Sequence, residues 1–396
     1  MLGRTNAVSG GKIKIQPVTN LTLSDKGVLS WNSPDISELT SKGYTVTLSY
    51  DVYVNDELKV STTNTSATLT EYLVEGENKI IVVAKAEIKY FESEAEIVEI
   101  WTAPAEVTVT TLPTLPTAVF GTSAVLIGNK AYIFGGNNGS ALNTILEFDP
   151  TTNTVTTLSA ILPTAISQTS AVVIDDKAYI FGGETSNGSG FTNKIREFDP
   201  TTNTVTTLSA TLPKSITATS AVAIDNKTYI FGGAGSMYNS VNTIIEYDKT
   251  TNTVTTLSAT LPTAVYGTSA VLIGNKAYIF GGRITGTGPV NTIIEFDPTT
   301  NTVTTLSATL PTAINDTSTV AINNKAYIFG GNNGSYLNTI LEFNPTTNTV
   351  TTLSAILPNV ASLIGSVSIN NKAYLFGGLY GSGRYLDTIV RIDNLG

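Results

Sequence analysis

From about residue 107 onward, the chain repeats a pattern of four short segments separated by polar turns. In the first copy, residues 123–127 (SAVLI) and 131–134 (AYIF) are apolar runs, and residues 144–148 (TILEF) contain one charge. Residues 154–158 (TVTTL) are mostly Thr. Runs of this length, rich in β-branched residues and bounded by Gly, Asn, Asp and Pro, predict strands. Because apolar content falls along the unit, we expect the first strand to be innermost and the fourth to be an outer edge.

The unit occurs six times, and each copy carries Phe-Gly-Gly at the end of its second strand. Successive Gly pairs lie 47, 50, 49, 49 and 47 residues apart. A period in this range is typical of stacked supersecondary units, and four antiparallel strands repeated six times predict a six-bladed β-propeller. The pairs are Gly135/Gly136, Gly182/Gly183, Gly232/Gly233, Gly281/Gly282, Gly330/Gly331 and Gly377/Gly378.

The sixth copy lacks a fourth strand of its own, and a matching segment precedes the first copy. After the third strand of this copy, at residues 388–392, no TVTTL sequence follows. Residues 108–112 (TVTTL) repeat the fourth-strand sequence of residues 253–257. We therefore expect residues 108–112 to complete the sixth blade as its outer strand, which would close the ring and remove an open sheet edge.

The order of conserved features within the unit resembles the kelch repeat over residues 107–396. In the first copy these features are Asn129-Lys130, the sequence YIFGG, a variable loop, an apolar-Glu-aromatic-Asp-Pro segment at residues 145–150, and Thr-Asn-Thr. Kelch units usually carry a Trp in the fourth strand, so we expect less aromatic packing between blades here. That position is Val155, Val205, Val254, Val303 and Val350.

Residues before about 106 do not share the period and predict a separate domain. Seven short alternating segments and an early Trp31 indicate a β-sandwich. Residues 16–103 resemble a fibronectin type III domain, with Trp31 in the second-strand position. Asn78 or Lys79 stands where such a domain often has a corner Tyr, so an immunoglobulin-like relative stays open.

The remaining N-terminal features concern attachment and charge. Residues 1–15 are interpreted as an N-terminal attachment segment, and the short junction at residues 103–105 predicts limited swing of the sandwich beside the propeller. Residues 1–106 carry 9 Lys and Arg against 15 Asp and Glu, and the rest carries 13 against 16. Most of the net charge of −9 therefore belongs to the N-terminal domain.

Composition narrows the chemistry that is available. The chain has no Cys and no His, which excludes thiol nucleophiles, disulfides, His general bases and nearly every zinc, copper or haem site. Kelch copper oxidases need His ligands and a Cys-linked Tyr. Six-bladed sialidases need an Arg triad and SxDxGxTW boxes, but no such box is present and residues 107–396 contain only Arg196, Arg283, Arg384 and Arg391. We expect no metal, no cofactor and no enzymatic activity. Few charges (13%) and an acidic balance argue against nucleic-acid binding.

The loops differ in how much they vary among the copies. Loops between strands one and two (GNK, DDK, DNK, NNK) and between strands three and four (DPTTNT or close to it) are nearly uniform. Loops between strands two and three, and the connections between blades, vary in length and sequence. Because strand direction alternates, both variable sets should emerge on one side of the disc. We call this side the variable face and the opposite side the uniform face.

The variable face is predicted to bind the partner, because aromatic residues, Arg and small polar residues suit adaptable recognition surfaces. The alternative is that these loops simply tolerate change. Glu184, Asp316 and Asp387 are also expected there, so a two-carboxylate glycosidase stays open. The predicted binding residues are Phe120, Phe191, Met237, Tyr238, Tyr266, Arg283, Asn315, Tyr336, Tyr380, Arg384 and Tyr385.

Two further sets of charged residues recur in the repeats, and both are predicted to have structural roles. One Lys precedes the second strand of each copy and is expected to be a solvated turn residue, with an anion or a neighbouring subunit as the alternative partner. A Glu recurs in the third strand of five copies, with Arg391 in the sixth, and is expected to be structural. The residues are Lys130, Lys177, Lys227, Lys276, Lys325 and Lys372, with Glu147, Glu197, Glu246, Glu295 and Glu342.

Together these patterns predict a non-enzymatic recognition or structural protein. A Cys-free all-β chain rich in Thr, Ser and Asn suits an extracellular surface, yet residues 1–17 lack the apolar segment of an ordinary Sec signal and no apolar run reaches a membrane span. We therefore expect a phage virion protein of the tail, baseplate or capsid surface, extracellular after lysis. The N-terminal sequence resembles short N-termini of phage tail and baseplate proteins.

In this interpretation the N-terminal segment and sandwich attach to other virion proteins, and the propeller binds a host-surface glycan or protein. The alternatives are a bacterial surface or secreted adhesin, a cytoplasmic kelch scaffold and a propeller enzyme acting on glycans. Self-association stays open, and no insertion into a membrane is expected.

Overall fold

The computed structural model describes residues 18–24, 27–41, 45–73, 76–88, 91–103, 106–186, 190–381 and 383–396. The chain divides into two compact units, Met1–Glu106 and Val107–Gly396. The predicted attachment segment, residues 1–15, lies outside the described residues, and so do residues 104 and 105 of the predicted junction. No helix in the described part of the chain has both the length and the apolar character needed to span a membrane.

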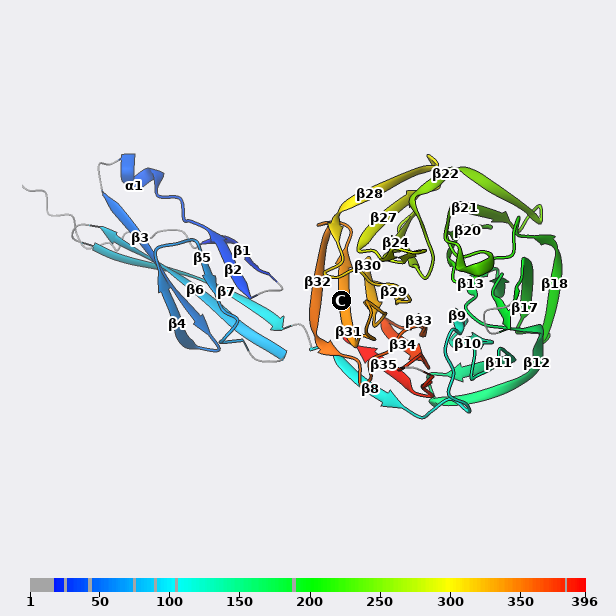
Figure 1. Ribbon diagram of the computed structural model, residues 1–396. Helices are drawn as coiled ribbons and strands as arrows, with labels where there is room; N and C mark the ends of the chain where they lie inside the picture. The colour runs from blue at the N-terminus through cyan, green and yellow to red at the C-terminus, as the bar shows by residue number, and fades with distance from the viewer. Residues whose placement is uncertain are drawn as a thin grey trace, which may run out of the picture. The chain divides into compact units, whose positions relative to one another are not determined.

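The N-terminal unit consists of two antiparallel sheets that share one hydrophobic core (Figure 1). Trp31 and Tyr50 lie at its centre, with ring centroids 5.2 Å apart in an edge-to-face arrangement. One sheet has the order β1 (Thr19–Leu23), β2 (Val28–Asn32), β5 (Ser66–Thr68). The other has the order β4 (Glu57–Thr62), β3 (Val46–Val54), β6 (Gly76–Ile88), β7 (Phe91–Ala103), and the short helix α1 (Ser37–Ser41) precedes β3.

The C-terminal unit contains six four-stranded antiparallel sheets, numbered here in chain order. Sheet 1 comprises β9 (Ser123–Ile127), β10 (Lys130–Phe134), β11 (Leu142–Asp149) and β12 (Thr154–Ile166). Sheet 2 comprises β13 (Ser170–Ile174), β14 (Lys177–Phe181), β17 (Lys194–Asp199) and β18 (Thr204–Thr211). Sheet 3 comprises β19 (Ser220–Ile224), β20 (Lys227–Phe231), β21 (Val241–Asp248) and β22 (Thr253–Val265).

The other three sheets follow the same pattern. Sheet 4 comprises β23 (Ser269–Ile273), β24 (Lys276–Phe280), β27 (Thr292–Asp297) and β28 (Thr302–Thr309). Sheet 5 comprises β29 (Ser318–Ile322), β30 (Lys325–Phe329), β31 (Thr339–Asn344) and β32 (Thr349–Ile356). Sheet 6 comprises β33 (Gly365–Ile369), β34 (Lys372–Phe376), β35 (Ile389–Asp393) and β8 (Thr108–Leu112). Minor elements are β15 (Glu184–Ser186), β16 (Gly190–Phe191), η1 (Ser236–Tyr238), β25 (Arg283–Ile284) and β26 (Gly288–Pro289).

The sheets stand around a common axis, and the first strand of each is innermost (Figure 1). Each first strand contacts the first strands of both neighbouring sheets, including β33 with β9. The second strands are buried on both faces, whereas the Thr-rich fourth strands alternate between exposed and partly buried residues. This order follows the fall in apolar content along the unit. No sheet in the described residues closes on itself.

Sheet 6 combines strands from both ends of the repeat array. β8 pairs with β35 in antiparallel register, with Leu112 opposite Ile389 and Thr108 opposite Asp393. The segment that precedes the first copy therefore occupies the outer position that TVTTL occupies in the other sheets. In sheets 1 and 3 this outer strand runs further than the sequence predicts, to Ile166 and Val265.

Hydrophobic clusters fill the spaces between neighbouring sheets, and aromatic rings take part in all six of them. The ring centroid of Phe148 on β11, for example, lies 5.5 Å from the ring centroids of both Tyr374 and Phe376 of sheet 6. Aromatic packing between sheets is therefore present without a Trp in the fourth strand. The third-strand aromatic ring fills the space, and the fourth-strand Val155 packs only at the edge of the cluster.

The repeated Lys and Glu side chains pair across the second and third strands. Lys130 Nζ lies 2.5 Å from Glu147 Oε1, and the Tyr132 hydroxyl donates to Glu147 Oε2 at 2.9 Å. Equivalent Lys–Glu pairs occur in sheets 2 to 5. In sheet 6, Lys372 and Arg391 both bind Asp393. The expectation that the lysines are simply solvated is therefore wrong, because a cross-strand carboxylate holds each of them.

Candidate functional site

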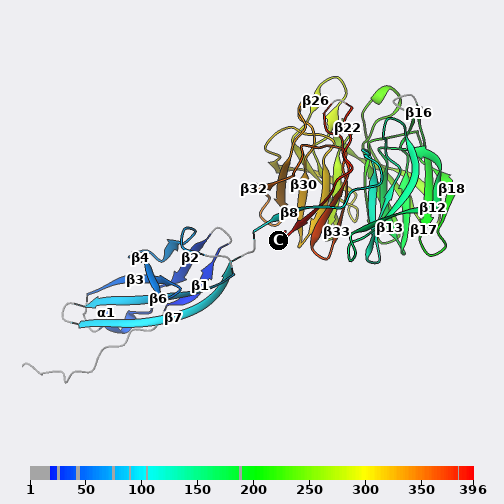
Figure 2. The same ribbon diagram turned by 90° about the horizontal axis from the view of Figure 1, so that it is seen from below.

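The Gly-Gly turns bring the two variable loop sets together. Gly135 and Gly136 have φ of 57° and 102°, and the Gly136 N–H donates to the Ile166 carbonyl at 2.9 Å. A Cβ atom at Gly135 would clash with the same carbonyl, so the close approach requires glycine. Isolated bridges join each connection to the following loop, as in Phe120 with Asn137. Both variable sets therefore lie on one side, where β16 and β26 are also found (Figure 2).

A closed circle of backbone hydrogen bonds surrounds the axis on this side. One residue of each connection adopts a left-handed conformation, with φ between 51° and 63°. The N–H of each donates to the carbonyl of the preceding one at 2.7–3.0 Å, and Gly121 completes the circle by donating to Leu363. Four of these residues are not glycine, so the circle holds them in a conformation they rarely adopt. This hub ring consists of Gly121, Gln168, Ala218, Gly267, Asp316 and Leu363.

A cavity of about 100 Å³ lies at the hub ring. Sheets 1 to 5 each contribute a Thr to its lining, whereas sheet 6 contributes Ile364 beside Leu363. The cavity thus has a polar wall and an apolar wall. Besides the hub ring, its lining residues are Thr122, Thr169, Thr219, Thr268, Thr317 and Ile364.

Hydroxyl pairs between neighbouring sheets satisfy most of these Thr side chains. Ser123 Oγ lies 2.8 Å from Thr169 Oγ1, and the same Ser–Thr pair recurs at the next three seams. At the seam between sheets 6 and 1 the Ser is replaced by Gly365. Thr122 Oγ1, in a residue that is 8% exposed, consequently has no hydrogen-bond partner.

Asp316 is the acidic member of the hub ring. Its carboxyl accepts a hydrogen bond from Asn315 Nδ2 at 2.6 Å. Burial raises the pKa of Asp316 to about 7, against the opposing effects of the nearby Arg283 charge and the Asn315 hydrogen bond. A Cβ atom at Gly267 would clash with Asp316 Oδ1, so the neighbouring glycine makes room for this side chain.

A second carboxylate, Glu184, lies on the same face and is 4% exposed. Its Oε2 accepts hydrogen bonds from the Tyr238 hydroxyl at 2.7 Å and from Gln168 Nε2 at 2.9 Å. The Tyr238 ring packs edge-to-face on Phe191 at 5.3 Å and lies 6.1 Å from Tyr266. Burial and the Glu184 carboxylate raise the pKa of Tyr238. These contacts join residues of sheets 2 and 3 and of the connections on either side of them.

Tyr266 extends the cluster toward the second carboxyl group. Its backbone forms an isolated bridge with Arg283, and the Arg283 charge also acts on Asp316. We call the continuous group of Gln168, Glu184, Phe191, Tyr238, Tyr266, Arg283 and Asp316 the polar arc.

The other predicted binding residues lie outside the polar arc or inside the protein. Phe120 and Tyr385 form a separate pair, 5.0 Å between ring centroids, near the seam of sheets 6 and 1. Met237 is 88% exposed. Asn315 is 4% exposed, and its side chain donates a hydrogen bond to Asp316 beneath the variable face. In the loop of sheet 6, the Tyr380 N–H donates to the Arg384 carbonyl at 2.8 Å, and in the loop of sheet 5, Tyr336 forms a backbone bridge with Asn332.

The sequence suggested Glu184 and Asp316 only together with Asp387, as carboxylates of an alternative glycosidase, and did not point to Gln168 or Thr122. Asp387 follows the variable loop of sheet 6, and its backbone carbonyl accepts a hydrogen bond from the Leu115 N–H at 2.7 Å. The signal for Gln168 was its place in a variable connection. Thr122 carried a weaker signal, the replacement of a repeated Ser by Gly365 in its partner sheet.

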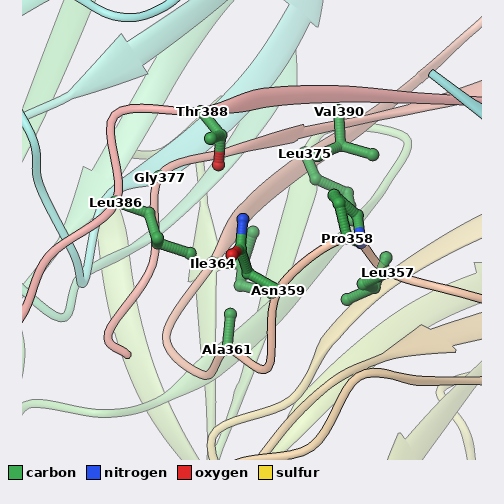
Figure 3. A pocket seen from close by; sticks show the side chains of 10 residues that line it. All are labelled: Leu357, Pro358, Asn359, Ala361, Ile364, Leu375, Gly377, Leu386, Thr388 and Val390. Atoms are coloured by element: carbon green, nitrogen blue, oxygen red, sulfur yellow. The ribbon is translucent and has the colours of Figure 1, made fainter. Parts of the chain in front are cut away.

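A smaller cavity, of about 20 Å³, lies between sheets 5 and 6 (Figure 3). Its lining is mainly aliphatic and includes Ala361, which replaces the Val or Ile of the other five copies. This volume holds about one water molecule, which would find few polar partners. It is therefore a gap in the packing, and the hub cavity is the candidate site. The described residues contain no group of three or more acidic side chains placed to hold a metal ion.

Comparison with known proteins identifies the family. The sequence matches the model of the KLHDC2/KLHL20/DRC7 Kelch-repeats domain over residues 98–217 and 168–378. The chain therefore belongs to the kelch-repeat family. The solved structure of YjhT has a TM-score of 0.61 and 18% identity, with 71% of this chain and 96% of that one covered. At this identity the likeness concerns the β-propeller fold alone. A search among curated proteins finds no match.

Proposed function

We propose that the C-terminal unit is a recognition module that binds a host-surface glycan or protein through its variable face, without chemical turnover. The polar arc is the observation that carries this proposal. Aromatic rings, amide groups, an Arg and two carboxyl groups from different sheets meet there. Surfaces of this composition bind polar partners through stacking and directed hydrogen bonds.

The same proposal includes a closed ring of six blades and a fibronectin type III-like sandwich. Support for closure comes from the hub ring and from the pairing of β8 with β35. Support for the sandwich comes from the strand orders β1-β2-β5 and β4-β3-β6-β7 around the buried Trp31. In this proposal the sandwich attaches the chain to a particle and the variable face of the C-terminal unit binds the partner.

We place the protein on a phage virion, where the partner is a receptor on the host cell. This setting rests on composition: no Cys, few charges and many Thr, Ser and Asn residues suit exposure outside the cell. A bacterial surface or secreted adhesin would use the same face in the same way. Electron microscopy of particles labelled with antibody against the chain distinguishes the two settings.

The test of recognition is binding of the full-length chain to a glycan array and to bacterial cells. Tyr238→Ala and Arg283→Ala should each weaken binding by about tenfold or more, as expected for residues at the centre of an interface. Thr201→Ala, at an exposed position in a uniform-face turn, serves as the matched control and should bind normally. Equal binding by all three variants would contradict the proposal.

One observation favours a second candidate, a glycan-active enzyme. The pKa of Asp316, raised to about 7, suits a general acid near neutral pH, and Glu184 is a second carboxyl group on the same face. Incubation of array-positive glycans with the full-length chain, followed by mass spectrometry, separates the two. Recovery of intact glycan supports recognition, whereas cleavage that Asp316→Asn abolishes would establish the enzyme.

A further inference from the structure

We propose that the hub cavity is the specificity subsite of the variable face and that it takes one neutral or amino sugar residue from the end of the bound glycan. This inference rests on the proposed function, because it assigns the ligand class of the same face. It also concerns residues that the polar arc does not contain, chiefly Thr122 and the apolar wall formed by Leu363 and Ile364.

The size of the cavity fits one sugar ring. About 100 Å³ is several times the ~10–15 Å³ that a single water requires. The hub ring fixes the walls by backbone hydrogen bonds, so the cavity is formed before a ligand arrives. Glycine at positions 121 and 267 leaves space that the side chains of Gln168 and Asp316 occupy. A longer glycan would enter with its terminal residue only.

The polar wall offers hydrogen bonds of the kind that sugar hydroxyls make. Thr122 Oγ1 is buried beside Gly365 and has no partner in the structure, so rotation of this side chain toward the cavity would let a ligand hydroxyl satisfy an atom that is otherwise costly to bury. Gln168 and Asp316 occupy opposite positions in the six-membered hub ring, as its bonding order shows. Amide and carboxyl groups on two sides can orient a ring that carries hydroxyls around its edge.

The opposite wall is apolar because sheet 6 departs from the repeat. Ile364 stands where the other five copies have Thr, and Leu363 is the hub ring's large aliphatic residue. A pyranose has a polar edge and an apolar C–H face, and it matches a cavity with one wall of each kind. A fully polar ligand would make no apolar contact with Leu363 and Ile364.

The charges near the cavity argue against an acidic sugar. The polar arc carries the carboxyl groups of Glu184 and Asp316 and one guanidinium, that of Arg283. The Arg283 charge already acts on Asp316, so above pH 7, where Asp316 is ionised, a ligand carboxylate would face two carboxylates and one guanidinium. A neutral sugar meets no such repulsion, and an amino sugar gains attraction.

The test uses saturation-transfer NMR of the full-length chain with four probes: D-galactose, N-acetyl-D-glucosamine, D-glucosamine and N-acetylneuraminic acid. We expect transfer to at least one of the first three and none to the acidic sugar. Thr122→Val keeps the shape of the side chain and removes its hydroxyl, and it should weaken monosaccharide binding by about tenfold. Thr201→Ala is the control.

The variants also separate failure of this inference from failure of the proposed function. If Tyr238→Ala abolishes glycan binding while Thr122→Val and Ile364→Thr leave it unchanged, the variable face binds but the hub cavity is not its subsite. Preference for the acidic sugar would overturn the inference in the same way. Thr122→Val removes a buried hydroxyl that has no partner, so the melting temperature of this variant should not fall. A loss of binding by the folded variant can then be assigned to the missing hydroxyl.

Discussion

Arg196 should destabilise the folded protein, because its guanidinium is buried without a partner. It lies on β17 opposite Ile180 and is 1% exposed. Its Nε and Nη1 atoms form no hydrogen bond, and burial lowers its pKa. At the equivalent position the other sheets place aliphatic residues that pack into the cores between sheets. These are Leu146, Ile245, Ile294, Leu341 and Val390.

The structure gives the size of the expected effect for Arg196→Leu. A buried polar group without a partner costs about 1–3 kcal/mol, and a charged group costs more. Replacing buried ions by well-packed aliphatic residues often stabilises a protein by about 1–4 kcal/mol. We therefore expect the free energy of unfolding to rise by about 2–4 kcal/mol. In a unit of this size that corresponds to a rise in melting temperature of about 4–8 °C.

Urea titration followed by circular dichroism, with a thermal scan as a second readout, measures this change. Leu146→Arg places the same charge at the equivalent position of sheet 1 and should lower stability by a similar amount. If Arg196→Leu left stability unchanged or reduced it while Leu146→Arg was destabilising, the reasoning would be refuted. Arg196 would then have to gain a compensating interaction that the structure lacks.

For two substitutions and for a change of pH, the structure also predicts whether the free energy of unfolding rises or falls. Thr228 has a buried hydroxyl without a partner where the other copies have Ala, so Thr228→Ala should raise the free energy of unfolding by about 1 kcal/mol in urea titration; a decrease would contradict this. Ala361→Val should fill the cavity between sheets 5 and 6 and add about 1 kcal/mol, whereas Ala373→Val, in a fully buried position outside that cavity, should destabilise. Because the pKa of Asp316 is raised to about 7, the folded state binds more protons than the unfolded state between the ordinary value of 3.8 and about 7. The free energy of unfolding should therefore fall as pH rises through this window and level off above it. Asp316→Asn should remove the part of this pH dependence that comes from Asp316. Identical profiles of melting temperature against pH for the two proteins would contradict the raised pKa of Asp316.

The repeated strands could be predicted because each copy gives the same local signals independently. The apolar runs at residues 123–127 and 131–134 begin and end within one residue of β9 and β10. The extension of β12 to Ile166 was missed, since Pro163 and the Thr-rich sequence carry no strand signal of their own. Tertiary pairing with Leu142 supplies what the local sequence does not.

The sequence was enough to predict that the variable loops share one side, but not the contacts among their side chains. Variable loops identified Tyr238, Tyr266 and Arg283, whereas the hydrogen bonds among Gln168, Glu184 and Tyr238 join three connections that are far apart in the sequence. The Lys–Glu pairs were missed for a related reason. Turn sequence alone does not show that a third-strand carboxylate lies beside Lys130.

Hydrogen–deuterium exchange on the full-length chain, with and without its best-binding glycan, tests the central claim most directly. Glycan binding should add protection in the loops at residues 234–241 and 282–290 and in the connection at residues 314–318. Uniform-face turns, such as residues 149–153, should exchange at the same rate in both states. Protection confined to the uniform face or to the N-terminal unit would contradict recognition through the variable face.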